Sequence, residues 1–375
     1  MRITDIETHV RGNILFVAVR TDSSVVGVGE SACWAYPEAV ASVVETFAAA
    51  LRGTDPRRIE RHWHLMWRMG PFRSAIVGAA LSAIDCALWD IKGRALNVPT
   101  HELLGGAYRD RIRLHAIIDG ADAEQLAQSA ARAATEGFTA VKFDPLEDTW
   151  IDHSTGEIAA RAVERTTAVR DATDGKVDMI VEVHRSLAPH QIPALLDGLR
   201  PLRPLFVEDP IQIDTFDVQT GLLAHGVPHG LGERWQAIWA VREALAANGP
   251  FIVRSDVTLA GGISAARKIA AIAEAHHAQV SWHNWLSPVS DAATLTVDAT
   301  IPNTLTHEHA PAQLAAFGDA IQTGWRVDEG YMVLSDEPGL GVEVDFARLP
   351  EGGDILGRHL HEIPFASDGS VAFAR

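Results

Sequence analysis

The first thirty residues alternate between apolar and polar side chains in three short stretches. Turn-forming residues interrupt the alternation at 11–13 (Arg-Gly-Asn) and at 21–24 (Thr-Asp-Ser-Ser). Alternation with a period of two is typical of half-buried strands, and such interruptions are typical of tight turns. The pattern therefore predicts a small antiparallel sheet of three strands at the start of the chain.

Helical periodicity replaces this alternation over 37–51, 56–69 and 74–92, where apolar residues recur every three to four positions. The prolines that open the first two segments suit the first turn of a helix. A glycine-containing linker at 105–110 then marks a domain boundary, so an α+β domain is predicted over 1–110. The tryptophans of these helices are most simply core residues: Trp63, Trp67 and Trp89.

After the linker, short apolar strands and helical segments alternate until about residue 310. Eight such units predict an α/β fold of the (β/α)8 type, a TIM barrel, in which the chemistry lies at the carboxyl ends of the strands. The predicted strands are 114–118, 140–143, 179–184, 205–208, 230–233, 251–256, 279–283 and 304–308.

Ionisable residues gather at the carboxyl ends of the predicted strands. Residues i and i+2 of a strand share a face, so Glu182 and His184 are expected to point to the same side. Packing alone does not require acids and histidines to repeat in phase from one strand to the next. We therefore interpret this set as functional: Lys142, Asp144, Glu182, His184, Glu208, Glu233, Asp256, His283 and Glu308.

Three of the glutamates, Glu182, Glu208 and Glu233, are separated by 26 and then 25 residues, about one strand, one helix and two loops. They are expected at the same end of three consecutive strands. Carboxylates about 4 Å apart repel by about 4 kcal/mol per pair at an effective dielectric constant of about 20. Such crowding indicates a bound divalent cation, and ligands that are all oxygen favour magnesium over zinc.

Composition narrows the possible partners. The 375-residue chain carries 32 basic and 49 acidic side chains, a net charge of −17, which argues against binding to nucleic acid. Its two cysteines, Cys33 and Cys86, imply no disulfide framework. Charged residues lie where a signal peptide would have its apolar core, and no run of about 20 apolar residues is present. We therefore expect a cytoplasmic protein without a membrane partner.

A glycine-rich stretch at 27–32, Gly-Val-Gly-Glu-Ser-Ala, matches the dinucleotide-binding pattern by letter. That motif must lead directly into a helix, whereas five residues ending in Pro37 intervene here. We interpret the glycines as the end of a strand instead.

Motifs along essentially the whole chain resemble those of the enolase superfamily, and within it the mandelate racemase branch and its galactonate dehydratase-like sugar-acid dehydratases. None of these motifs is specific alone, but together they are. They are Gly-Val-Gly-Glu at 27–30, Ala-Leu-Trp-Asp-Ile-Lys-Gly at 87–93, the acidic strand ends at 181–184, 207–210 and 232–234, Ala-Gly-Gly-Ile at 260–263, His-Asn-Trp-Leu-Ser-Pro at 283–288 and Pro-Gly-Leu-Gly-Val-Glu at 338–343.

The resemblance implies a modified barrel, (β/α)7β, over 111–319. It also implies that the capping domain, 1–110, is completed by the C-terminal segment 320–375. Homo-oligomers are common in the family, so an assembly of several copies is expected.

The resemblance also implies the roles of the rim residues. Glu182, Glu208 and Glu233 would bind magnesium, although the family more often has aspartate at the first position. His283, oriented by Asp256, would be the general base. His184 would protonate the departing hydroxyl, and Glu308 would hydrogen-bond the substrate carboxylate.

The chemistry of the residues agrees with these roles. The proton beside a carboxylate is very weakly acidic, and enolase-superfamily sites remove it with a lysine or histidine base and one or two magnesium ions. Histidine has a pKa near working pH, and a carboxylate partner fixes its tautomer. The predicted reaction is loss of water from an aldonic acid, such as galactonate or gluconate, to give a 2-keto-3-deoxy acid.

Three alternatives stay open. A racemase, epimerase or cycloisomerase of the same superfamily is disfavoured because a racemase usually has a second lysine where Asp144 stands. A zinc hydrolase, suggested by the triplet His307, Glu308 and His309, is disfavoured because Glu308 would face away from both histidines. A catalytically silent binding homologue is kept open by Glu182, whose extra methylene moves the carboxylate by about 1.5 Å where metal sites tolerate about 0.2 Å.

Substrate contacts are predicted from the same register and from the capping loops, 33–36 and 70–73. Arg73 is the candidate in the second loop, and the alternative, which the sequence favours, is that it is a solvated surface arginine. Trp285 is expected in the pocket wall. Lys142 and Asp144 lie at the end of the second barrel strand. Trp282 and Trp285 bracket His283, and both are candidates for a bulky pocket wall. The alternative for Trp282 is that it faces the barrel exterior, because its neighbour His283 must face inward.

Overall fold

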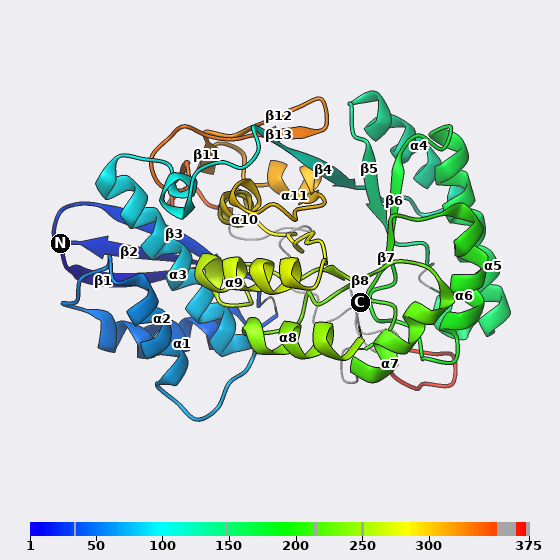
Figure 1. Cartoon of the computed structure of the whole chain (residues 1–375), viewed down its shortest axis with the longest axis horizontal. Coiled ribbons are helices and arrows are strands. Elements are labelled where there is room, and N and C mark those ends of the chain that lie inside the picture. The colour runs from blue at the N-terminus through cyan, green and yellow to red at the C-terminus, as the bar shows by residue number, and fades with distance from the viewer. Residues whose placement is uncertain (34, 147–148, 213–215, 249–250, 351–364, 373–375) are drawn as a thin grey trace.

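The computed structural model describes residues 1–375 except 34, 147–148, 213–215, 249–250, 351–364 and 373–375. At one end of the molecule, helices pack on a small antiparallel sheet of order β1-β2-β3 (Figure 1). The predicted strands and helices are confirmed there, except that Pro56 precedes its helix by three residues. The elements are β1 (Ile3–Arg11), β2 (Ile14–Thr21), β3 (Val26–Ser31), α1 (Pro37–Leu51), α2 (Ile59–Arg68), α3 (Ala75–Leu96) and the 3-10 helix η1 (Thr100–Leu104).

The glycines of strand β3 allow helix α3 to approach its backbone closely. A Cβ atom at Gly29 would lie 1.9 Å from the carbonyl oxygen of Ala83, and one at Gly27 would lie 2.1 Å from that of Ala87. No side chain fits such a gap, so packing explains the Gly-Val-Gly sequence. The rejection of a dinucleotide loop is therefore consistent with the structure.

The barrel follows. Strands β4 to β9 pair in parallel in chain order, and β10 pairs with β4, which closes the circle. Segment 280–283 occupies the seventh place, bridged to β9 and to residue 304. The strands are β4 (Arg111–Ile117), β5 (Ala140–Phe143), β6 (Asp178–Glu182), β7 (Phe206–Glu208), β8 (His229–Leu231), β9 (Ile252–Val253) and β10 (His307–His309).

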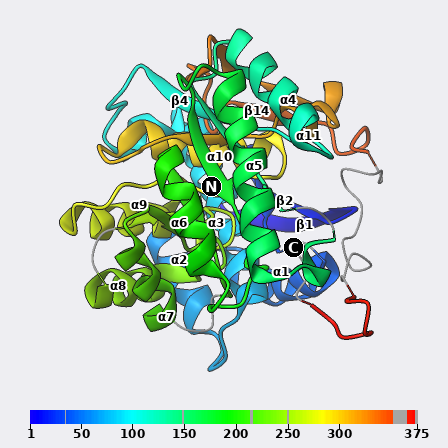
Figure 2. The same ribbon diagram turned by 90° about the vertical axis from the view of Figure 1, so that its right-hand side faces the viewer.

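Helices alternate with these strands, and α4 to α6 cover the side of the barrel farthest from the small sheet (Figures 1 and 2). The architecture is the predicted α/β fold, a modified TIM barrel with an N-terminal α+β unit. The barrel helices are α4 (Ala123–Thr135), α5 (Thr155–Ala172), α6 (Ile192–Leu199), α7 (Phe216–Gly221), α8 (Ala237–Asn248), α9 (Gly262–Ala275) and α10 (Pro288–Thr300), with short 3-10 turns η2 (Trp150–Asp152), η3 (Arg200–Leu202) and η4 (Leu222–His225).

One local prediction is wrong. The third barrel strand ends at Glu182, so His184 is not in it and does not share a strand face with Glu182. The backbone turns instead, with φ of 52° at His184 and 61° at Arg185. The N–H of His184 donates to Glu182 Oε1 at 2.8 Å, which stabilises this turn.

The C-terminal segment returns toward both parts of the chain. Strand β13 extends the sheet antiparallel to β4, and the segment beyond it contacts the small domain. The backbone N–H of Leu340 donates to Asp90 Oδ1 at 2.9 Å, and Arg11 Nη2 donates to the carbonyl of Phe346 at 3.2 Å. The remaining elements are α11 (Pro311–Ala315), η5 (Gly318–Ala320), β11 (Ile321–Thr323), β12 (Arg326–Asp328), β13 (Tyr331–Val333) and β14 (Val342–Val344).

The division at 110 and 320 stays a prediction, and parts of the segment 320–375 lie outside the described residues. Trp63, Trp67 and Trp89 are all buried, as predicted, and two of them hydrogen-bond to the barrel. Trp63 Nε1 donates to the carbonyl of Gly261 at 2.8 Å, and Trp89 Nε1 donates to Ser264 Oγ at 2.9 Å. In the described part of the chain, no helix combines the length and apolar character that crossing a membrane requires.

Candidate active site

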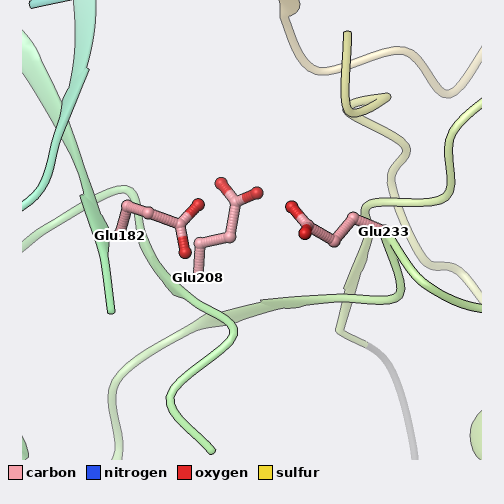
Figure 3. Close-up of side chains that lie close together, drawn as sticks. All are labelled: Glu182, Glu208 and Glu233. Carbon is pink, nitrogen blue, oxygen red and sulfur yellow. The ribbon is translucent and has the colours of Figure 1, made fainter. Parts of the chain in front are cut away.

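The three predicted glutamates converge at the carboxyl end of the barrel. Glu182 and Glu208 are the last residues of β6 and β7, and Glu233 follows β8 by two residues. Figure 3 shows their carboxylates directed toward a common space. One oxygen from each lies within 4.8 Å of the others, and all three side chains are buried.

Lys142 and Arg254 are buried cations that contact both this cluster and Glu308. Lys142 Nζ lies 3.2 Å from Glu182 Oε2, 3.2 Å from Glu208 Oε1 and 2.9 Å from Glu308 Oε2. Arg254, fully buried, lies 2.8 Å from Glu208 Oε1 through Nη2 and also pairs with Glu308. Its Nη1 donates to the carbonyls of Ser281 and Trp282, so the guanidinium is held in one orientation.

A second buried arginine crosses the cluster on the side of Glu233. Arg185 Nη1 lies 2.6 Å from Glu233 Oε1 and 2.9 Å from Asp209 Oδ2. The backbone supports this placement, because the N–H of Arg185 donates to the carbonyl of Asp209 at 2.7 Å. Arg185 and Asp209 both adopt positive φ angles, a conformation that costs of order 1–3 kcal/mol for residues other than glycine and that recurs at functional sites.

These surroundings move the pKa values of the three glutamates apart. Burial alone raises the pKa of a carboxyl, and this effect prevails at Glu208, whose pKa is well above its ordinary value. At Glu182, His184 and Lys142 outweigh burial and lower the pKa to about 2. At Glu233, Arg185 and then His283 hold the pKa well below its ordinary value.

The cluster fits a hard divalent cation. All three donors are carboxylates, the ligand type that magnesium prefers. The oxygen Oε2 of Glu208 is buried and has no hydrogen-bond partner among the described residues. An orphaned carboxylate oxygen at this position is what a metal ligand requires, since burying it unpaired is otherwise costly.

The predicted base, His283, is held by a carboxylate on the far side of the cluster. Its Nδ1 lies 2.7 Å from Asp256 Oδ2, and its Nε2 lies 3.6 Å from Glu233 Oε2. Thr258 donates to Asp256 from its N–H and its hydroxyl, both at 2.7 Å. Burial lowers the pKa of His283, but Glu233 and then Asp256 raise it, and the net pKa lies above its ordinary value.

The predicted acid, His184, has a carboxylate partner as well. Its Nδ1 lies 2.6 Å from Asp144 Oδ2, while Asp144 Oδ1 accepts from the N–H of Leu146 at 2.7 Å. The side chain of His184 is about one-third exposed, which leaves Nε2 as the ring nitrogen that can reach a substrate. Asp144 therefore contacts His184, and its predicted contact with substrate stays a prediction.

Glu308 is surrounded by donors. Besides Lys142 and Arg254, His115 Nε2 lies 3.3 Å from its Oε2. Burial alone would raise the pKa of Glu308, but Arg254 and then Lys142 hold it well below its ordinary value. On the same strand, His307 pairs with Asp298 through Nδ1 at 2.9 Å, so Glu308 reaches the cavity and His307 contacts an outer helix.

A cavity of about 680 Å³ connects these groups. A volume of this size is typical of a small-molecule site. Among the described residues, those that line it all lie between Ile117 and Glu308 and include Lys142, Trp285 and both histidines. Trp282 is fully buried among the core residues, as expected for the barrel exterior.

The capping loops do not line this cavity in the part of the chain that the structure describes, which excludes Trp34. Arg73 is exposed and lies over the ring of Trp67, 4.9 Å from its centroid. Its predicted role as a substrate contact stays a prediction.

Sequence reasoning missed two residues that shape the site. In the predicted strand 251–256, Arg254 shares a face with Asp256 by the period of two, and this signal could have identified it, although β9 itself ends at Val253. Arg185 carries no such signal, because its direction depends on a positive φ that follows the strand end.

Comparisons with known proteins agree with this geometry. Residues 125–348 match the family model for the enolase C-terminal domain-like fold, and residues 3–105 match that for the mandelate racemase/muconate lactonizing enzyme N-terminal domain. The chain is 34% identical to D-galactonate dehydratase of Variovorax paradoxus, with 99% of this chain and 100% of that protein aligned. It is 33% identical to D-galactonate dehydratase of Xanthomonas oryzae pv. oryzae over the same shares.

Solved structures are similar over the full length as well. One is an enolase from Agrobacterium radiobacter, proposed to be a galactarate dehydratase, with sodium and L-malate bound. The two chains superpose with a TM-score of 0.92 at 26% identity and 100% coverage of both. The matching domain models and these relatives place the chain in the mandelate racemase/muconate lactonizing enzyme family of the enolase superfamily.

Proposed function

We propose that the protein is a magnesium-dependent sugar-acid dehydratase. It would take an aldonic acid such as galactonate or gluconate and release a 2-keto-3-deoxy acid and water. The arrangement that carries this proposal is His283, held by Asp256 beside the glutamate cluster, with His184 in the same cavity. The full-length relatives named D-galactonate dehydratase support the choice of reaction.

Glu182, Glu208 and Glu233 would hold the magnesium ion. When bound, such a cation stabilises the negative charge that develops on the substrate carboxylate as the neighbouring proton is removed. Lys142 lines the same cavity and carries a positive charge, since Glu208, Glu308 and Glu182 raise its pKa despite its burial. We infer that its ammonium attracts the substrate carboxylate toward the cluster.

His283 is the residue that would remove the proton. Asp256 occupies Nδ1, so Nε2 is the atom that faces the cavity and accepts the C2 proton. A pKa raised above its ordinary value strengthens this nitrogen as a base. His184 Nε2 would donate a proton to the C3 hydroxyl, which leaves as water. The predicted hydrogen bond from Glu308 to the substrate carboxylate would require a proton between the two carboxylates.

The direct test is incubation of the purified protein and magnesium with a library of aldonic and aldaric acids, with 2-keto acids as the readout. We expect keto acid from at least one aldonate. Absence of product across the library, with magnesium shown to be bound, would contradict the proposal.

The variant His283→Asn should lower turnover by at least about 100-fold, because general bases contribute about 10²–10⁴. Elemental analysis should find its metal content unchanged, since His283 is not a ligand. His277→Asn, at an exposed histidine beyond the end of α9, is the matched control. Turnover retained in His283→Asn would refute the assignment of the base.

A second candidate is epimerisation at C2, favoured by the presence of two histidines that each have a carboxylate partner in one cavity. Deuterium oxide distinguishes the two reactions. Recovery of an inverted, C2-deuterated sugar acid without loss of water would replace the dehydratase proposal.

A further inference from the structure

Two histidine–aspartate pairs lie on opposite sides of the barrel rim. Counted from β4, Asp144 follows the second strand and His184 the third, while Asp256 follows the sixth and His283 lies on the seventh. Each member of one pair is therefore four strands from its counterpart, and β10 closes the barrel as the eighth strand. Four of eight strands is half a turn, so the pairs face each other across the cavity.

The pairs also match in detail. In each, the aspartate binds Nδ1, at 2.6 Å in one and 2.7 Å in the other. In each, the second oxygen of the aspartate is fixed by a backbone N–H two residues further along, from Leu146 for Asp144 and from Thr258 for Asp256. Both carboxylates are thus fixed before they orient a ring.

We propose that Asp144 is the positioning residue of the acid, as Asp256 is of the base. It would hold the ring of His184 with Nδ1–H toward the carboxylate and Nε2 toward the C3 hydroxyl. This inference rests on the proposed dehydration. It differs from the predicted contact between Asp144 and substrate, because Asp144 acts here only through His184.

The backbone of His184 is left-handed, so the orientation of its ring depends on Asp144. The residue lies beyond the end of β6, so no strand neighbour fixes the direction of its side chain. The side chain is also about one-third exposed, unlike the enclosed His283. An imidazole at such a position would rotate between several orientations if its partner were removed.

The chemical step balances with these groups. The C2–H bond breaks reversibly as its proton moves to His283 Nε2, and its electron pair is first delocalised into the substrate carboxylate as an enediolate. In the next step this electron pair forms the C2–C3 double bond. The C3–O bond breaks, and the oxygen leaves as water with the proton from His184 Nε2. The resulting enol tautomerises to the 2-keto acid. Because base and acid lie half a barrel turn apart, the proton and the hydroxyl depart from opposite faces.

The variant Asp144→Asn isolates the role of Asp144. Asparagine keeps an oxygen that can accept from Leu146 but places an N–H opposite Nδ1, which selects the wrong tautomer of His184. We expect kcat to fall by at least about 100-fold and KM to change by less than about threefold. In deuterium oxide, the unreacted sugar acid should still gain deuterium at C2, because His283 and Asp256 are intact.

A substrate with fluoride in place of the C3 hydroxyl provides the decisive comparison, because fluoride leaves without a proton. Asp144→Asn should release fluoride at nearly the wild-type rate, whereas His283→Asn should not. The proposal would be overturned if Asp144→Asn lost C2 exchange and fluoride release as well as dehydration. It would also be overturned if Asp144→Asn kept full dehydration activity. Asp178→Asn, at the opposite end of β6, is the matched control for removing a carboxylate.

Nitrogen-15 NMR of the histidine rings gives a readout that needs no substrate. The wild-type His184 signal, identified by its absence in His184→Asn, should show a protonated Nδ1, and Asp144→Asn should shift it to an unprotonated Nδ1. An unchanged His184 signal would overturn the pairing. Failure of the wild-type protein to form keto acid would refute the proposed dehydration alone, because the NMR comparison would still test the pair.

Discussion

Replacing Arg254 with methionine should destabilise the protein strongly. The guanidinium is fully buried, lies 2.8 Å from Glu208, also pairs with Glu308, and donates to the carbonyls of Ser281 and Trp282. Methionine fills a similar volume, so the cost comes from two buried carboxylates that lose a shared cation. Removing one partner of a buried ion pair costs about 3–5 kcal/mol.

This free energy converts to a measurable shift in melting temperature. The entropy of unfolding is about 2.1 cal/mol/K per residue, so for 375 residues the loss corresponds to about 4–6 °C. Differential scanning calorimetry without added metal is the assay, because a bound cation would offset part of the uncompensated charge. The conservative Arg254→Lys should recover only part of the loss, since an ammonium cannot contact both carboxylates and both carbonyls in the same planar geometry.

The matched control is Arg242→Met. Arg242 is 56% exposed and pairs with Glu243 at 2.9 Å, so its loss should change stability by less than about 1 kcal/mol. If Arg254→Met melted at the same temperature as Arg242→Met, the ion pairs of Arg254 with Glu208 and Glu308 would not contribute to stability beyond what Lys142 supplies.

Two further predictions concern the scaffold. His307 is fully buried, and although burial lowers its pKa, hydrogen bonds to Asp291 and Asp298 raise it to about 9. The raised pKa contributes up to about 3 kcal/mol of stability, which is present below about pH 6.5 and lost as pH rises through about 9. Urea unfolding measured over this pH range should show that the stability of His307→Gln depends less on pH than that of the wild type. An equal pH dependence of the two proteins would contradict this prediction. Gly29→Ala should lower the free energy of unfolding by more than about 2 kcal/mol, because its Cβ would lie 1.9 Å from the carbonyl oxygen of Ala83. A melting temperature within about 1 °C of wild type, which corresponds to a change on the order of 1 kcal/mol, would disprove the close packing.

The regular features of the site could be predicted from the sequence because the barrel itself is periodic. Glu182, Glu208 and Glu233 repeat with the length of one strand and one helix, and the structure brings them together at one rim. His283 and Asp256 follow from the same register and form the expected hydrogen bond.

The irregular features could not be predicted, and each depends on a backbone that leaves the period. His184 was placed in a strand that ends two residues earlier, so its partner Asp144 was not foreseen. Arg185 enters the cluster only through a left-handed turn. Arg73 depends on how a loop of the small domain lies, and it stacks on Trp67 instead of lining the cavity.

The returning C-terminal segment also determines when the small sheet and its helices can acquire their full set of contacts. Arg94 pairs with Glu343 and donates to the carbonyl of Val342, about 250 positions later, and His9 stacks on Phe346 with ring centroids 4.2 Å apart. On the ribosome, the N-terminal residues emerge first, yet these partners are synthesised near the end of the chain. Such long-range contacts slow folding. The surfaces of β1 and α3 that contact the C-terminal segment therefore stay exposed while the barrel is synthesised. A chaperone that covers β1 and α3 during this time should raise the yield of folded protein.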